Sequence, residues 1–385
     1  MVGAALSLPH KRGKFMIYFD NSATTPPAIE VVDTITEYMK TSFGNPSSRH
    51  ALGLEAEKLV ADARRKVASA LGVTPDEIYF TSGGTQADNI ALLGAANIKK
   101  GKRIITTSVE HPAVAETVNY LETQGFDVIR IKPQKDGSVK LTDILDAITP
   151  DTVLVSVMHV NNETGAVMPV HKIGAVLKRI APRALFHVDA VQSFGHIAVK
   201  PSAWGIDLMS ISSHKIHGPK GIGALYIRKG TTLKPSVFGG GQEKNIVSGT
   251  ENVGAIVGFG KASELINLAD SEKVLEIKNY LRENLLRIEG SVHNGGSAEE
   301  SPYILNISFG KIRSEIMLNA LSNEGIYVSS GSACARGAHT SGVLLEMESP
   351  LPDSAIRFSL SRYNTLEEAK TVAEKVTEIA KNIQV

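Results

Sequence analysis

Short apolar runs alternate with helical patterns along the first two thirds of the chain. Five of these runs are rich in β-branched residues and apolar along most of their length, which is typical of strands buried on both faces. They are RIITTSV (103–109), DVIRI (127–131), TVLVSVM (152–158), ALFHVD (184–189) and LMSIS (208–212). Apolar residues at helical spacing lie between them, at 87–97, 113–123, 141–148 and 173–180. Strands that alternate with helices predict an α/β fold with a mostly parallel central sheet.

The pattern changes near residue 260. Long helical patterns at 255–268 and 272–287 are followed by one strand-like run, YILNISF (303–309), and a last helical pattern at 366–382. This change predicts a large domain over 16–259 and a smaller α+β domain over 260–385. Because no Pro- or Ser-rich linker separates the two, we expect them to pack together.

Composition narrows the class of protein. The chain is 42% hydrophobic, which is enough for a sizeable core. Its 41 basic and 40 acidic residues nearly cancel, so charge offers no case for nucleic acid or an anionic membrane as a partner. No run of 18 apolar residues is present, and residues 1–15 read as an N-terminal extension or cloning remnant, not as a secretory signal. A single cysteine, Cys334, excludes an internal disulfide and suits a reducing, cytoplasmic compartment.

Two charged residues come directly after predicted strands. Lys215 lies just past LMSIS, in HKIHGPKG, and Asp189 ends ALFHVD. The carboxyl ends of parallel strands meet at the edge of a sheet where ligands bind. Pyridoxal 5'-phosphate (PLP) needs both residue types, because a lysine forms its Schiff base and a carboxylate pairs with its pyridine nitrogen. The simpler alternatives are a solvated lysine and a helix N-cap aspartate.

Two further elements fall at the same predicted edge. TSGGTQ (81–86) follows the apolar run IYF (78–80) and opens a helical pattern, so its glycines and helix N-terminus suit a phosphate. His111 follows RIITTSVE, and its imidazole could stack on a pyridine ring and move protons. A plain turn and a hydrogen-bonded loop histidine are the alternatives. Four such elements at one edge favour a PLP site.

From about Tyr18 to Lys381 the sequence resembles the cysteine desulfurases of the class V aminotransferase group, which have the type I fold of PLP-dependent transferases. The motifs that carry the resemblance are YFDNSATT (18–25), FGNPSS (43–48), TSGGTQADN (81–89), EHPAV (110–114), MHVNNETG (158–165), HVDAVQ (187–192), SSHKIHGPKG (212–221), GGGQEKNIVSGTEN (239–252), SSGSAC (329–334) and IRFSLSR (356–362). The resemblance implies an enzyme that removes sulfur from L-cysteine and leaves L-alanine.

The resemblance also implies a role for each matching position. Lys215 would bind PLP covalently, Asp189 would hold its ring nitrogen, and Gln192 would hold its phenolic oxygen. His111 would stack on the ring and move protons. The residues that would hold the phosphate are Gly84, Thr85, Ser212 and His214, with Thr250 reaching it from a neighbouring subunit of a homodimer.

Substrate contacts are implied in the same way. Arg357 would bind the substrate carboxylate through its guanidinium fork. Asn162 would contact cofactor or substrate, and Asn161 is the weaker candidate for that contact. Val247 departs from the pattern, because many relatives carry Arg just before Ser-Gly-Thr. No metal site is expected.

Cys334, at the end of SSGSAC, would receive the sulfur, and Arg336 would help to favour its thiolate. The thiolate would attack the substrate sulfur, alanine would leave, and a persulfide would remain on Cys334. An acceptor protein, either an iron–sulfur scaffold or a tRNA-thiolation protein, would then take the sulfur.

Other functions fit the same fold, including an aminotransferase, a selenocysteine lyase and a non-enzymatic scaffold. Cys334 favours a desulfurase over an aminotransferase, which needs no thiol at that position. The presence of Lys215, Asp189 and His111 argues against a scaffold, because a protein that no longer used PLP would be expected to lose them.

Overall fold

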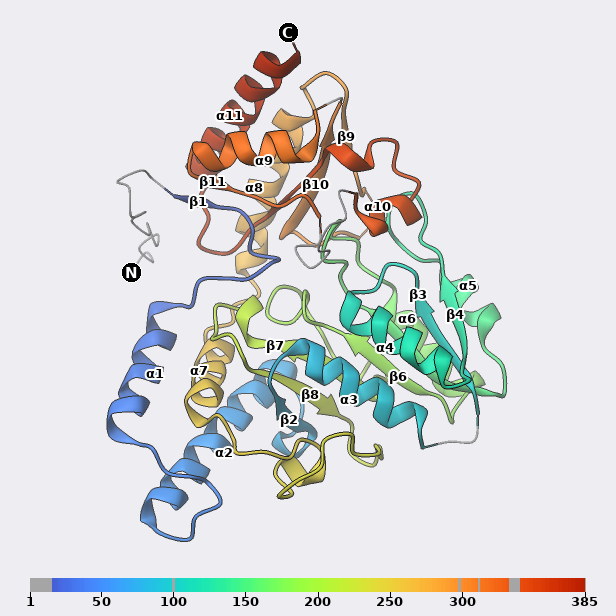
Figure 1. The fold of residues 1–385 in the computed structure, drawn as a ribbon, viewed down its shortest axis with the longest axis vertical. Helices are drawn as coiled ribbons and strands as arrows, with labels where there is room; N and C mark the ends of the chain where they lie inside the picture. The colour runs from blue at the N-terminus through green and yellow to red at the C-terminus, as the bar shows by residue number, and fades with distance from the viewer. Residues whose placement is uncertain (1–15, 99–100, 297–298, 311, 332–339, 385) are drawn as a thin grey trace.

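The computed structural model describes residues 16–98, 101–296, 299–310, 312–331 and 340–384. A larger part is built on a central sheet, and a smaller part with the C-terminus lies against one end of it (Figure 1). The chain begins beside the smaller part, where β1 (Ile17–Tyr18) pairs in parallel with β11 (Ile326–Tyr327). It then enters the larger part through α1 (Ile29–Thr41) and α2 (Ala51–Leu71).

Within the described residues the central sheet has seven strands, in the order β2-β8-β7-β6-β5-β3-β4. Their bounds are β2 (Ile78–Thr81), β3 (Arg103–Thr107), β4 (Asp127–Ile131), β5 (Thr152–Met158), β6 (Leu185–Asp189), β7 (Leu208–Ser212) and β8 (Gly223–Ile227). Along the sheet from β4 through β3, β5 and β6 to β7, each strand is parallel to its neighbour. This arrangement confirms the mostly parallel sheet. β8 is antiparallel to both β7 and β2, so β2 points in the same direction as β7.

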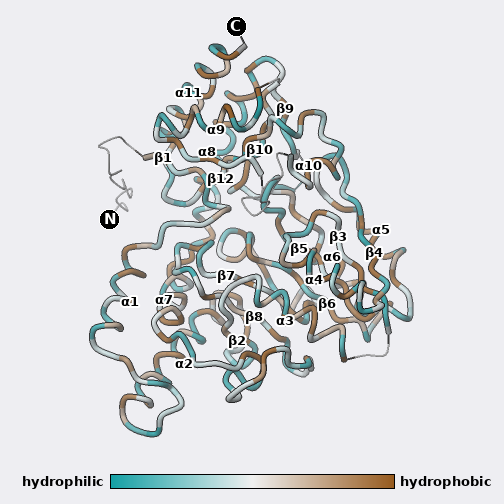
Figure 2. The backbone as a smooth tube through the Cα atoms, viewed as in Figure 1, coloured by the Kyte–Doolittle hydropathy of each residue, from teal (hydrophilic) through white to brown (hydrophobic). Residues whose placement is uncertain are grey.

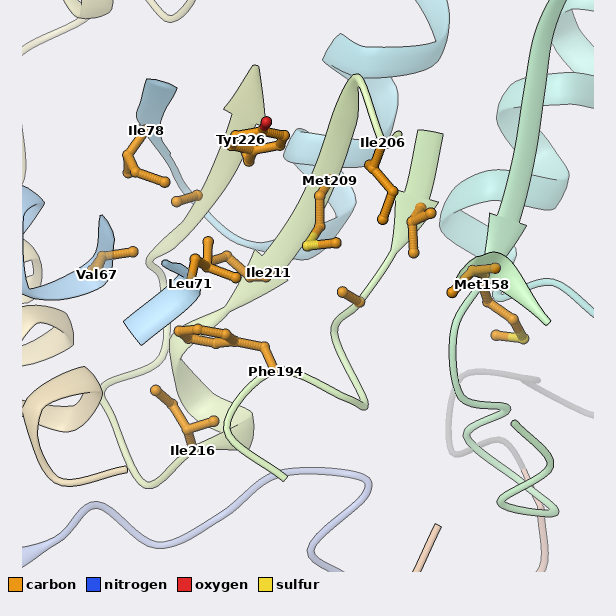
Figure 3. Close-up of a cluster of buried hydrophobic side chains, with 14 of the residues drawn as sticks. Val67, Leu71, Ile78, Met158, Phe194, Ile206, Met209, Ile211, Ile216 and Tyr226 are labelled. Atoms are coloured by element: carbon orange, nitrogen blue, oxygen red, sulfur yellow. The ribbon is translucent and has the colours of Figure 1, made fainter. Parts of the chain in front are cut away.

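The inner strands are buried on both faces because successive side chains enter two different cores. Along β5, Val155 and Val157 pack into one core, called the first core below, and Leu154 packs into the other, called the second core. Figure 3 shows the first core, where Val67 and Leu71 of α2 point toward side chains of the strands. This double burial explains why the sequence shows continuous apolar runs at these strands.

Helices cover both faces of the sheet. α3 (Gly84–Ala96) and α4 (Pro112–Thr123) contribute to the second core. The helices that contribute to the first core are α1, α2, α5 (Leu141–Ala147), α6 (Val170–Ile180) and α7 (Val253–Glu264). α2 buries Ala56, Val60, Ala63 and Val67, a spacing of three or four residues that forms one apolar stripe.

The smaller part has its own antiparallel sheet, in the order β12-β10-β9, and its own core. The bounds of these strands are β9 (Ser291–His293), β10 (Ile304–Phe309) and β12 (Ala355–Ser359). The helices of this part are α8 (Asp270–Leu285), α9 (Ser314–Asn323), α10 (Gly342–Glu346) and α11 (Leu366–Gln384). Figure 2 shows hydrophobic and hydrophilic positions alternating along α11, as an amphipathic helix requires. Phe19, just after β1, also lies in this core. The domain division near residue 260 stays a prediction.

The expected strands and helices are present, although RIITTSV is a strand only as far as Thr107. The sequence patterns raised no expectation for several elements, namely β1, α1, α2, β8, β9, α9, β11, α10 and β12. Among the helices of the described residues, none combines the length and apolar character needed to span a bilayer.

Gly174 of α6 provides a test of the packing on the sheet. A Cβ at this position would lie 1.7 Å from the backbone oxygen of Trp204. Alanine stabilises an ordinary helix by about 1 kcal/mol relative to glycine, but here we expect Gly174→Ala to lower the free energy of unfolding by roughly 1–3 kcal/mol through overpacking. The control is Gly342→Ala in α10, where a Cβ meets nothing within 4 Å. Denaturant unfolding that shows equal stability for the two variants would contradict this packing.

Candidate active site

Polar side chains from five segments meet at one edge of the central sheet, because the strands that precede them all point the same way. β2 leads into the turn at Gly83, β3 leads to His111, and β5 leads to Asn162. β6 ends at Asp189, and β7 leads to Lys215. The tertiary structure therefore brings together residues that are up to about 130 positions apart in the sequence.

Lys215 lies in a single 3-10 turn, Ser213–Lys215, that follows β7. Its side chain is buried, and Nζ donates hydrogen bonds to the carbonyl oxygen of Ser22 and, at 2.9 Å, to that of Ala23. The neighbouring His214 shares a hydrogen bond of 3.1 Å with Thr24 through Nδ1. The YFDNSATT segment and the lysine loop therefore form one wall of the site.

Asp189 and His111 are close enough for their charges to interact. Asp189 is buried, and its Oδ1 accepts a hydrogen bond from the Val191 N–H at 2.9 Å. Burial raises the pKa of Asp189, while positive charge on His111 and Lys215 lowers it. A cation placed beside Asp189 would therefore favour its ionised form.

His111 is the N-cap of α4, and this position fixes its tautomer. Its Nδ1 accepts a hydrogen bond from the Ala113 N–H at 3.1 Å, so the neutral ring carries its proton on Nε2. Burial lowers the pKa of His111, which favours this neutral form. Pro112 at the first helical position starts α4 directly after the imidazole.

The turn between β2 and α3 is shaped to receive an anion. A Cβ at Gly84 would lie 2.7 Å from the Val191 side chain, so the start of α3 fits closely against the loop after Asp189. Ser212 Oγ, at the end of β7, is buried and makes no hydrogen bond within the part of the chain that the structure describes. Thr85, in the first turn of α3, is exposed. Free N–H groups at a helix start together with an unpaired hydroxyl suit a phosphate.

Arg357 of β12 reaches the same region from the smaller part. Its Nη1 donates to the Asn162 carbonyl oxygen at 2.9 Å, and its Nη2 donates to Asp20 Oδ1 at 2.8 Å. Its Nε is buried and has no hydrogen-bond partner among the described residues. One donor of this buried guanidinium is thus available to a carboxylate ligand.

The two adjacent asparagines after β5 differ in what their side chains do. Asn161 Nδ2 donates to the Val109 carbonyl oxygen at 3.1 Å, and Oδ1 accepts from the N–H groups of Glu163 and Thr164. Asn161 therefore holds its own turn together. The Asn162 side chain makes no hydrogen bond to any described residue, which leaves it as the available amide.

Of the remaining predicted residues, the structure describes Gln192, Thr250 and Val247. Gln192 Nε2 donates to the Ser22 carbonyl oxygen at 3.0 Å. Thr250 is exposed and lines a cavity that also contacts Ser82, and Val247 lines the same cavity. Cys334 and Arg336 lie outside the described residues.

Sequence reasoning missed two buried carboxylates behind the site. Both oxygens of Glu110 lie 3.0 Å from the Met158 N–H, and Oε1 also accepts from Thr107 Oγ1 at 2.7 Å. Burial raises the pKa of Glu110 to about 8. Asp88 Oδ1, on α3, lies 3.5 Å from His187 Nε2, and burial raises the pKa of Asp88 well above its ordinary value. Glu110 could have been selected from the sequence, because it comes directly before His111 at the end of a predicted strand.

Asp20 was also missed, although it belongs to the YFDNSATT motif. Its bond to Arg357 Nη2 ties the N-terminal segment to β12. Two residues on, the Ser22 N–H donates to Ser359 Oγ at 2.9 Å in the same strand. Asp20 could have been selected from the sequence, because it comes directly after a short apolar run.

The side chains at this edge fit PLP. The buried lysine amine suits the PLP aldehyde, and the buried carboxylate suits its pyridine nitrogen. The neutral imidazole suits its aromatic ring, and the helix start with an unpaired hydroxyl suits its phosphate. The fit rests on these side chains and their surroundings.

Comparisons with known proteins agree with the fold and the site. The class-V aminotransferase family matches residues 17–372. The chain belongs to this family. The cysteine desulfurase IscS of Methanosarcina thermophila is 43% identical over 376 residues, which cover 96% of this chain and 93% of the relative. Within the class-V aminotransferases, the chain is therefore a member of the cysteine desulfurase family.

Solved structures support the same placement. A NifS-like protein is 38% identical, with a TM-score of 0.90 over 95% of this chain and 100% of that one. A structure of SspA in complex with cysteine is 33% identical, with a TM-score of 0.81 over 91% of this chain and 100% of that one. These likenesses confirm the fold class expected from the sequence, and the family implies PLP as cofactor.

Glu110 generates a pH-dependent prediction for the cofactor-free protein. Its folded pKa of about 8 lies above the ordinary value, so between about pH 4.5 and 8 the unfolded chain ionises Glu110 while the folded chain keeps it protonated. The free energy of unfolding should therefore fall as pH rises through this window, by up to about 1.4 kcal/mol per pH unit from this group. Glu110→Gln should lack this slope.

Guanidinium unfolding of both proteins at pH 5, 6.5 and 8 gives the comparison. Only the difference in slope matters, because the substitution itself changes the hydrogen bonds to Met158 and Thr107. Parallel stability curves for the two proteins would show that Glu110 is ionised in the folded state.

Proposed function

We propose that this protein is a PLP-dependent cysteine desulfurase that takes sulfur from L-cysteine, releases L-alanine and carries the sulfur as a persulfide on Cys334. The observation that carries the proposal is the meeting of Lys215, Asp189 and His111 at one sheet edge, in a chain of the cysteine desulfurase family. A thiol at position 334 is what separates this function from transamination on the same fold.

Several of the residues described above would hold the cofactor. Lys215 would bind PLP covalently, Asp189 would face its ring nitrogen, and Gln192 would face its phenolic oxygen. The residues that would hold its phosphate are Gly84, Thr85, Ser212 and His214, with Thr250 of a neighbouring subunit. PLP, when bound, withdraws electrons from the α-carbon of an amino acid.

The chain's own groups supply orientation and proton transfer. Arg357 would bind the substrate carboxylate through Nε, while its two Nη atoms stay on Asp20 and the Asn162 carbonyl. The neutral His111 ring holds a proton on Nε2, because Nδ1 is occupied by the Ala113 N–H. Nε2 is therefore the atom from which His111 would donate a proton.

Sulfur transfer would use the thiolate of Cys334. This thiolate attacks the substrate sulfur, an S–S bond forms, and the bond between that sulfur and the substrate β-carbon breaks. The electron pair of the broken bond goes to the β-carbon, which takes up a proton as alanine is formed. One cysteine and one enzyme thiol thus become one alanine and one persulfide, with no other oxidant or reductant.

We infer that the enzyme works as a homodimer and passes its sulfur to an acceptor protein. α1 exposes Met39 and the following segment exposes Phe43, at 73% and 81%, which is unusual for large apolar side chains in water and suits a subunit contact. The acceptor would be an iron–sulfur scaffold or a tRNA-thiolation protein. A cytoplasmic location, expected from the single cysteine, stays a prediction.

Cys334→Ala tests the sulfur step. We expect the variant to keep the visible absorbance of bound cofactor and to lose sulfide release from cysteine under reductant, because the thiol takes no part in cofactor binding. Lys215→Ala is the control, and it should lose the characteristic cofactor absorbance as well as activity. Sulfide release by Cys334→Ala at the rate of the unmodified enzyme would rule out the persulfide on this residue.

Ser212→Ala tests the phosphate contact. A hydrogen bond to a charged group contributes about 1.5–3 kcal/mol, so its loss should weaken PLP binding roughly 10- to 100-fold in a titration of the cofactor-free protein. The matched control is Ser263→Ala in α7, whose buried Oγ also has no partner among the described residues. Both variants should fold as stably as the parent without PLP. Equal PLP affinity in the two variants would exclude Ser212 from the phosphate site.

A further inference from the structure

The turn that follows β5 is held rigid by its own hydrogen bonds. Asn161 Oδ1 accepts from the Glu163 N–H at 2.9 Å and from the Thr164 N–H at 3.0 Å, and the Gly165 N–H donates back to the Asn161 carbonyl oxygen at 3.0 Å. Gly165 has φ of 79°, a conformation that favours glycine. Glu163 therefore projects from a turn with little freedom of its own.

The smaller part of the protein holds the same turn from outside. Arg357 Nη1 donates to the Asn162 carbonyl oxygen at 2.9 Å, and Asn306 Nδ2 donates to the Glu163 carbonyl oxygen at 3.1 Å. The backbone at 162–163 is thus fixed to β12 and β10. Any group that the Glu163 side chain contacts is placed relative to Arg357 and Asn162.

The Glu163 carboxylate hydrogen-bonds to one described end of the segment that contains Cys334 and lies beside the other. The side chain is buried, and its Oε2 accepts a hydrogen bond from Ser341 Oγ at 2.5 Å. On the other side, a Cβ added to Gly331 would lie 3.2 Å from the same Oε2. Gly331 also has φ of 123°, so both its conformation and its closeness to Glu163 call for glycine.

Other contacts fasten the flanking chain. Ser329 and Arg357 exchange two backbone hydrogen bonds, at 2.7 and 3.2 Å, before the segment. After it, Ser341 Oγ caps α10 by accepting from the Leu344 N–H at 3.1 Å, and Glu346 of α10 accepts from Ser108 Oγ at 2.8 Å. Glu163 thus lies between the two described ends, bonded to Ser341 and beside Gly331.

We propose that Glu163 is a positioning residue for sulfur transfer: its hydrogen bond to Ser341 and its place beside Gly331 set both ends of the Cys334 segment relative to Asn162 and Arg357. The proposal rests on the proposed function, because it assigns Glu163 a role in the step that uses the Cys334 thiol. Its physical basis is that a thiolate must approach the substrate sulfur closely, and a displacement of about 1 Å can slow a reaction 100-fold.

The bond between Glu163 and Ser341 can be broken and rebuilt without removing the cap of α10. Ser341→Asp keeps a good N-cap but places a second carboxylate against Glu163. Ser341→Asn is the matched control, because asparagine both caps the helix and can donate to Glu163. The double variant Glu163→Gln with Ser341→Asp restores a hydrogen bond with donor and acceptor exchanged.

Two measurements on the PLP-loaded enzyme separate positioning from general damage. The first is the steady-state rate of alanine formation from cysteine, with kcat and KM determined separately. We expect Ser341→Asp to lower kcat about 10- to 100-fold with KM within about threefold, because substrate binding does not involve the segment ends. Ser341→Asn should stay within about threefold of the parent, and the double variant should recover most of the loss.

The second measurement is hydrogen exchange of the amides at 340–346, without cysteine present. These amides should exchange faster in Ser341→Asp than in Ser341→Asn, and the double variant should restore the slower exchange. If Ser341→Asp does not fold, Ser341→Gly replaces it, because glycine is a tolerated N-cap that cannot donate to Glu163.

The results distinguish the two proposals. A parent enzyme that forms no alanine from cysteine would overturn the proposed function, while the exchange measurement would still report on the Glu163 contact. An active parent with unchanged kcat in Ser341→Asp would overturn the positioning role. A double variant with a kcat no higher than that of Ser341→Asp would also overturn it. So would a Ser341→Asp variant that loses kcat but also melts at a lower temperature and has a raised KM, because that pattern indicates general damage.

Discussion

The direction of the strands in the central sheet is the constraint on which the site depends. Because β3, β5, β6 and β7 are parallel, the segments after them leave the sheet at the same edge. β2 joins them because β8, which lies between β2 and β7 in the sheet, is antiparallel to both. Without that reversal, the start of α3 would lie at the opposite edge from Lys215, and no single ligand could contact both.

Burial decides the charge state of the groups at this edge. Behind Asp189, the His187 ring lies between Ser156 and Ser210, with Oγ atoms 2.8 and 3.0 Å from its nitrogens, and burial lowers the pKa of His187 to about 3. Burial likewise raises the pKa of Glu110 to about 8. Burial therefore favours the neutral forms of these two groups, while positive charge on His111 and Lys215 favours the ionised form of Asp189.

The strands could be predicted from the sequence because double burial leaves apolar runs, as in TVLVSVM, and the helices between them because one-sided burial leaves a periodic stripe. α1 was missed although Val31, Ile35 and Tyr38 form an apolar stripe at helical spacing that packs on the first core. β8 was missed because GALYI begins with glycine and alanine, which are depleted in strands. For β8 the surrounding sheet, and not the local pattern, selects the element.

For the site, Lys215, Asp189, His111 and the turn at 81–86 could be selected from the sequence alone, because each comes directly after an apolar run that reads as a strand. The sequence also determined which residue types are available for chemistry, including one thiol and no disulfide. Only the tertiary structure decided that Asp20 pairs with Arg357, 337 positions away, and that Glu163 bonds to Ser341 while lying beside Gly331. Such contacts depend on how two separately built sheets are placed against each other, and no periodicity along the chain carries that information.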